Sequence, residues 1–104
     1  MRTNWTITVD HIAEPGEKAP SNQNAVGMIG PRDATLTHDQ IKNHKDRVAF
    51  KMYDDDKNLY YSGFMVPGDE GEAEFGPLDD FGTPNAGCTE IKIKNKSTGE
   101  WETV

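Results

Sequence analysis

Two strand-like segments joined by a short acidic turn constrain the fold of this chain most. Residues 47–53 (RVAFKMY) and 59–66 (LYYSGFMV) are rich in apolar and aromatic side chains, and the DDDKN between them consists of turn-forming residues. The pattern predicts an antiparallel hairpin. Pairing Phe50 with Tyr61 gives this hairpin one apolar face, so we expect that register.

A second hairpin is predicted near the C-terminus, where TEIKIKN and EWETV flank the turn KSTG. Pairing Ile93 with Trp101 packs apolar side chains on one face and places lysines beside glutamates on the other. Because both faces favour the same register, we expect Trp101 to pack against Ile93.

The N-terminal part contributes two further strands. Side chains alternate between apolar and polar in residues 5–12 (WTITVDHI), which predicts a half-buried strand, and residues 25–29 (AVGMI) form a short apolar run. The segment between them, residues 13–24, is rich in Pro, Gly, Ser and Asn and is predicted to be a loop.

One helix and one long loop complete the predicted elements. Thr37 and Gln40 form a capping box, which predicts a short helix over residues 38–45. Residues 67–87 contain many Gly and Pro without periodicity, and a loop of that length in a compact domain is usually functional or mobile. Within it we expect Phe81 to plug the core, with Pro84 and Gly87 setting turns. The predicted fold class is α+β: a small, mostly antiparallel sheet or partly open barrel of five to six strands with one short helix, in a single domain over residues 1–104.

The charge of the chain is regional. The net charge is −7, but residues 53–82 hold nine of the eighteen acids against one base, Lys57. This distribution argues against direct binding to a phosphate backbone, which requires Lys and Arg, and favours either a basic protein partner or no charged partner. The candidate partner-binding residues are Asp54, Asp55, Asp56, Asp69, Glu70, Glu72, Glu74, Asp79 and Asp80.

The sequence contains one fragment of a metal-binding motif. Asp54, Asp56 and Asn58 match the opening of a calcium-binding EF-hand loop, but the required glycine is replaced by Leu59 and the closing glutamate by Met65. A solvated hairpin turn is the favoured interpretation, with weak calcium binding as the alternative. No metal site and no cofactor are expected.

The single cysteine raises the question of catalysis. Cys88 would need a base such as His11, His38 or His44 beside it and a lowered pKa to act as a nucleophile. A buried structural thiol just before a strand is the favoured interpretation. The Asp79–Asp80 pair would need burial to serve acid–base chemistry, so no catalytic residue is expected.

The expected setting is the cytoplasm. A single cysteine cannot form an internal disulfide, and the chain has no apolar stretch as long as a signal peptide or membrane span. We therefore expect no membrane partner. The oligomeric state and the identity of a partner are left open.

The C-terminal half, residues 50–103, resembles a family of small proteins found in phages, prophages and related bacterial genomes. The resemblance is carried by YDDD, PLDD, NAGCT and GEW, the last near the C-terminus. It implies a mobile-element setting and assigns no catalytic or binding residue.

In that setting the acidity suggests an inhibitor. We expect a non-enzymatic acidic binding protein that engages a basic surface of nucleic-acid-handling host machinery, as a mimic of DNA charge. The alternative is a small enzyme or metal-binding module that uses the Asp54–Asp56–Asn58 turn, or Cys88 with a histidine.

Overall fold

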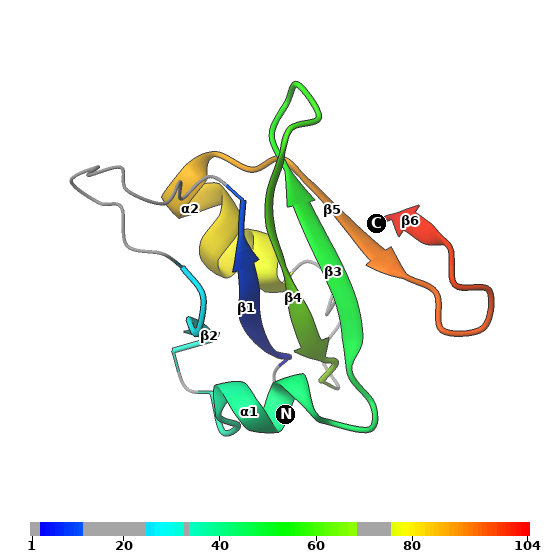
Figure 1. The fold of residues 1–104 in the computed structure, drawn as a ribbon. Coiled ribbons are helices and arrows are strands. Elements are labelled where there is room, and N and C mark those ends of the chain that lie inside the picture. The colour runs from blue at the N-terminus through cyan, green and yellow to red at the C-terminus, as the bar shows by residue number, and fades with distance from the viewer. Residues whose placement is uncertain (1–2, 12–24, 33, 69–75) are drawn as a thin grey trace.

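The fold is a six-stranded antiparallel sheet with short helices on both of its faces (Figure 1). The computed structural model describes residues 3–11, 25–32, 34–68 and 76–104. The strand order is β2-β1-β4-β3-β5-β6, with β2 and β6 at the two edges.

The strands are β1 (Asn4–Asp10), β2 (Ile29–Gly30), β3 (Val48–Tyr53), β4 (Leu59–Val66), β5 (Glu90–Lys94) and β6 (Trp101–Thr103). The helical elements are α1 (His38–Lys42), the π-helical turn η2 (Leu78–Gly82) and α2 (Thr83–Ala86). The α+β class is confirmed, and the sheet is open rather than closed into a barrel.

Helix α1 begins where the capping box predicts. The Thr37 side chain accepts from the Gln40 backbone N–H at 3.2 Å, and the Gln40 side chain accepts from the Thr37 N–H at 2.8 Å. The helix ends at Lys42, earlier than expected, because Asn43 caps it by donating to the Asp39 carbonyl from both its backbone and its side chain. Ile41 is its one buried residue.

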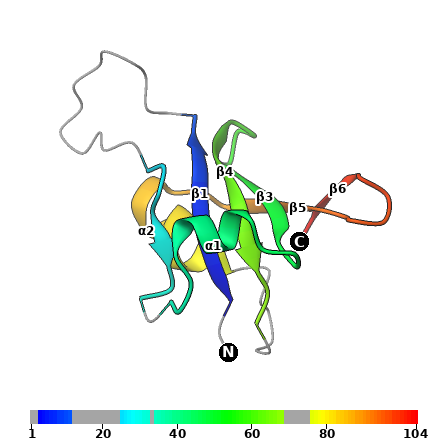
Figure 2. The same ribbon diagram turned by 60° about the horizontal axis from the view of Figure 1, so that its bottom comes forward.

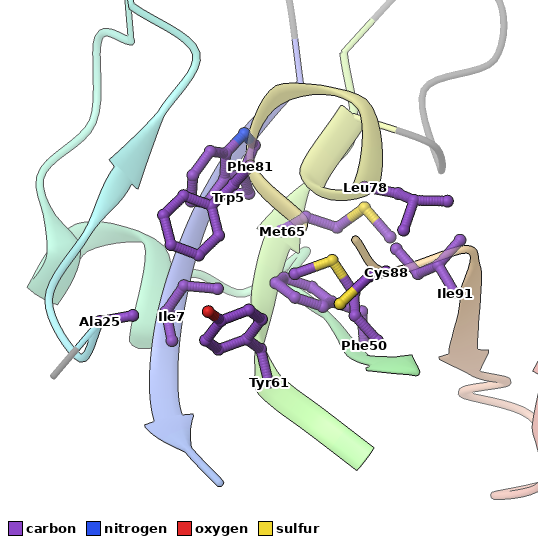
Figure 3. Close-up of a cluster of buried hydrophobic side chains, with 11 residues drawn as sticks. Trp5, Ile7, Ala25, Phe50, Tyr61, Met65, Leu78, Phe81, Cys88 and Ile91 are labelled. Atoms are coloured by element: carbon purple, nitrogen blue, oxygen red, sulfur yellow. The ribbon is translucent and has the colours of Figure 1, made fainter. Parts of the chain in front are cut away.

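The core lies between the sheet and the η2–α2 segment (Figure 3). Three aromatic rings connect these two layers: the centroid of Phe81 lies 5.5 Å from that of Trp5 and 5.1 Å from that of Tyr61. Phe50 from the middle of the sheet is fully buried beside them. The expectation that Phe81 plugs the core is confirmed.

The segment that contains Phe81 is helical, however, where a loop was predicted. From Gly76 to Ala86 the backbone follows one continuous helical path with a π-helical centre. Pro84 is the second residue of α2, and Gly87 ends the helix in the left-handed conformation at φ 70°. The Gly and Pro content hid this helix because both residues also signal turns.

The first hairpin pairs in a register two residues away from the predicted one. Phe50 lies opposite Gly63 rather than Tyr61. A side chain at position 63 would place its Cβ 2.8 Å from Phe50 Cζ, so the missing side chain makes room for the ring. A shift of two residues keeps the side chains on their predicted faces from Val48 to Met52. Beyond Met52 the register shifts again, so Leu59 lies opposite Tyr53, and Tyr60 packs against the core instead.

The C-terminal hairpin differs by one residue, which changes its faces. Trp101 lies opposite Lys94 rather than Ile93. The turn closes when Asn95 N–H donates to the Glu100 carbonyl at 2.8 Å and Gly99 N–H donates back to the Asn95 carbonyl at 2.7 Å. Turn geometry thus fixes the register, and Trp101 leaves the core side of the sheet.

The two N-terminal strands also have different bounds. β1 ends at Asp10 rather than continuing to residue 12, and β2 contains only Ile29 and Gly30. The predicted loop over residues 13–24 lies outside the described residues.

Candidate functional site

The acidic turn between β3 and β4 is held by its first aspartate. One Asp54 carboxylate oxygen accepts from the backbone N–H of Asp56 at 2.9 Å and of Asn58 at 2.8 Å. The other oxygen accepts from the Asn58 side-chain amide at 3.0 Å. These hydrogen bonds lower the pKa of Asp54, with the bond from the Asn58 side chain as the largest cause. Asp55 and Asp56 are exposed to solvent in this hydrogen-bonded turn.

Asp79 and Asp80 lie in the first turn of η2, and both are exposed. Asp80 accepts a hydrogen bond from the Trp5 indole N–H at 3.0 Å. It therefore ties η2 to β1 in addition to carrying charge. The remaining predicted partner-binding acids, Asp69, Glu70, Glu72 and Glu74, lie outside the described residues.

The predicted partner-binding acids that the structure describes are divided between two places on the molecule. Trp5, which holds Asp80, pairs with Met65 near the far end of β4, whereas the acidic turn precedes Leu59 at its beginning. Leu59 and Met65 are six positions apart, which corresponds to roughly 20 Å of strand. The acidic turn is therefore a separate feature from the η2 acids.

Cys88 is fully buried in the core cluster. Burial, with a smaller contribution from the nearby Asp54 carboxylate, raises the pKa of its thiol to about 11. A thiol with a pKa this high is almost entirely protonated at neutral pH and is a poor nucleophile. Its environment is that of a structural core residue.

The three histidines are engaged elsewhere. His38 shares a hydrogen bond with the Thr6 hydroxyl, His11 with the Ser62 hydroxyl, and His44 accepts from the Asp46 backbone N–H. Within the described ranges, no group of three His, Cys, Asp or Glu side chains is placed to hold a metal ion.

The face of the sheet opposite the core carries a feature that the sequence reasoning missed. Three cations lie over three aromatic rings there, namely Arg47 over Phe64 at 5.4 Å, Lys51 over Trp101 at 4.3 Å and Lys92 over Tyr53 at 5.2 Å. The strand registers place all six side chains on this one face, because Ala49 pairs with Phe64, Lys51 with Lys92, and Lys94 with Trp101. We call this set, together with Lys94, the cation–aromatic face.

Helix α1 covers only part of that side of the sheet, as Figure 2 shows. It lies over β1 and β4, where Thr6 and Ile41 are fully buried. β3, β5 and β6 extend beyond the helix. Trp101 is 36 % exposed and Lys94 is exposed, so this half of the face is open to solvent.

A signal for the cation–aromatic face was present in the sequence. In EIKIK the isoleucines Ile91 and Ile93 alternate with Glu90, Lys92 and Lys94, and Lys51 stands between Phe50 and Met52. Strand alternation therefore separates the bases from the core residues. Summing the charge over contiguous segments concealed this, because Lys51 and Lys92 are far apart in sequence and are brought together only by strand pairing.

Comparisons with protein-family models, curated proteins and solved structures give no match for this chain. Among the described residues, no helix is both long enough and apolar enough to cross a membrane.

Proposed function

We propose that this protein is a non-enzymatic binding protein whose acidic side chains engage a basic surface on a protein partner. The most concrete form is an inhibitor, encoded by a phage or other mobile element, that imitates the charge of DNA. Its target would be the nucleic-acid-handling machinery of the host. The basic surface of a host factor is the proposed partner.

The observation that carries the proposal is the construction of the acidic turn. A mimic of phosphate charge needs carboxylates fixed in position, because ordering flexible side chains on binding costs conformational entropy. Asp54 uses its own carboxylate to order the turn, and Asp55 and Asp56 are thereby presented from a rigid hairpin tip. The segment that contains this tip is also the most acidic part of the chain.

Charge reversal tests the proposal once a partner has been captured from a bacterial host lysate. Asp55→Lys with Asp56→Lys changes the exposed charge and leaves Asp54 to hold the turn. We expect this pair to abolish binding, and we expect the affinity of the unmodified protein to fall as salt rises.

The matched control reverses two exposed acids elsewhere, Asp46→Lys with Glu100→Lys. Both double variants must first show an unchanged circular dichroism spectrum and a cooperative melt. If the two pairs weaken binding equally, or if affinity does not respond to salt, the acidic turn is not the binding surface.

The second candidate, an enzyme or metal-binding module, has weaker support. Its turn lacks the glycine and the glutamate of a calcium loop, Asp54 is already occupied by hydrogen bonds, and the pKa of Cys88 is raised. Calcium titration calorimetry separates the two: micromolar binding that Asp54→Asn abolishes would favour the metal-binding module.

A further inference from the structure

The cation–aromatic face contains a like-charge arrangement that the fold itself does not require. Lys51 of β3 and Lys92 of β5 lie directly opposite each other in the antiparallel register. Like charges at such positions destabilise a sheet, and a surface position could be filled by many other residues. Local conflicts of this kind are concentrated at functional sites, where a ligand compensates them.

Negative charge on this face is sparse. Among the outward-facing positions of β3, β5 and β6, all of which the structure describes, Glu90 is the only acid. Glu90 accepts a hydrogen bond from Lys57 and lies 3.8 Å from Lys92 Nζ. The cation–aromatic face thus has three lysines on two strands, together with Arg47, against one carboxylate. It is locally basic in a protein that is acidic overall.

Aromatic rings lie between these cations. β5 separates β3 from β6, so Lys51 and the Trp101 ring meet above β5. Tyr53 and Lys92 form a second pair beside them. Alternating rings and cations on an open sheet are the two parts of a surface that binds single-stranded nucleic acid: rings stack on bases, and lysines neutralise the phosphates between them.

We propose that the cation–aromatic face binds single-stranded nucleic acid without base specificity. An acidic peptide would satisfy the lysines equally well but offers no planar group for Trp101 and Tyr53, which is why the nucleic acid is favoured. The net charge of −7 opposes a polyanion, yet screening at physiological salt limits this repulsion to a range of about 8 Å. The single-stranded nucleic acid therefore interacts electrostatically mainly with the lysines of this face.

This proposal revises the expectation from segment charge that no nucleic acid binds directly. It does not depend on the proposed function, because the acidic turn and the cation–aromatic face use different side chains. Asp55→Lys with Asp56→Lys is expected not to weaken nucleic-acid binding, so the two proposals can fail separately.

Fluorescence anisotropy with a labelled oligothymidylate of about 15 nucleotides, the upper range for one small sheet domain, tests the proposal over a series of salt concentrations that reaches about 0.15 M. Trp101→Ala should weaken binding about tenfold, the scale of one lost stacking contact, and Trp101→Phe should restore most of it. Lys51→Ala and Lys92→Ala should each reduce the slope of log affinity against log salt by about 0.7, the value for one phosphate contact to a single strand.

Lys42→Ala is the matched control, because it removes one exposed cation from α1. It should leave both affinity and salt slope nearly unchanged. Circular dichroism and a melt establish folding for every variant, and the lysine variants keep the test decisive if Trp101→Ala does not fold. Absence of binding throughout the salt series, an equal loss in Lys42→Ala, or equally tight binding of a glutamate peptide that also depends on Trp101 would each overturn the proposal.

Discussion

The two faces of the sheet use aromatic side chains in opposite ways. On the core face, rings meet rings: Phe81 lies against both Trp5 and Tyr61. On the other face, rings meet cations, as in the pair of Lys51 with Trp101. The first arrangement excludes water and joins η2–α2 to the sheet, whereas the second stays in contact with solvent.

This difference shows that neighbouring residues on one strand have separate roles, one in stability and the other in function. Phe50 and Lys51 are adjacent in sequence, but the pleat directs one into the core and the other to the open face. We therefore expect changes on the core face to alter the free energy of unfolding and changes on the open face to alter binding. The predictions below test that separation.

The largest expected effect is the loss of a core ring. Phe81→Ala should lower the free energy of unfolding by about 3–5 kcal/mol, because it leaves a cavity between η2 and the sheet. Trp101→Ala, on the open face, should lower it by no more than about 1 kcal/mol, the scale of an exposed cation–π contact. Urea denaturation measures both values, and similar losses would mean that the two faces do not differ in this way.

The next effect concerns the close approach of β1, β3 and β4. Gly63→Ala would place a Cβ 2.0 Å from the Thr6 carbonyl oxygen and 2.8 Å from Phe50 Cζ. The strands must shift, and we expect a loss of about 1–3 kcal/mol, as for other overpacked cores. Gly76→Ala is the control, since its Cβ would meet Thr3 at an ordinary 3.6 Å. Equal melting temperatures for the two variants would contradict the close packing.

Removal of the Cys88 thiol should have a smaller effect on stability. Cys88→Ala should cost about 1–2 kcal/mol of stability and leave binding intact. Its raised pKa also predicts a pH dependence: as pH rises from the ordinary thiol value of 9.0 toward about 11, the unfolded chain loses this proton first. Stability should therefore fall over that range. Rapid labelling of the native protein by a thiol reagent at neutral pH would show that the thiol is not buried.

The smallest effect concerns the acidic turn. The pKa of Asp54 is lowered by its hydrogen bonds, so its stabilising contribution is present above the ordinary value of 3.8 and is lost as pH falls through the lower folded value. Asp54→Asn should slightly lower the melting temperature at neutral pH and flatten its decrease in acid. Asp55→Asn, at an exposed position of the same turn, should do neither. If the two variants behave alike, Asp54 does not order the turn.

Local patterns predicted much of the fold. The capping box at Thr37 and the two hairpins depend on neighbouring residues, and each is found in the structure. The alternation predicted for β1 is wrong, because α1 buries Thr6 and a register shift between Ile7 and Val9 leaves Val9 exposed. The helical path from Gly76 to Ala86 was not predicted, because its stability comes from packing Phe81 against Trp5 and Tyr61 rather than from helix-forming residues.

The candidate sites divide in the same way. Asp54, Asp55 and Asp56 were predicted from sequence because a turn is local, and Asp54 indeed organises it. The separation of Asp80 from that turn could not be predicted, since it depends on where η2 docks.

The sequence by itself determined the strands, the acidic turn and the alternation that sends lysines away from the core. Only the tertiary structure decided that Lys51, Lys92 and Trp101 share one open face, because strand order and register depend on contacts between distant segments. The turn at Asn95 and Gly99 moved Trp101 by one residue, and a shift of one residue changes the face of a strand. Helix α1 then left that half of the sheet open, because this short helix lies mainly over β1 and β4.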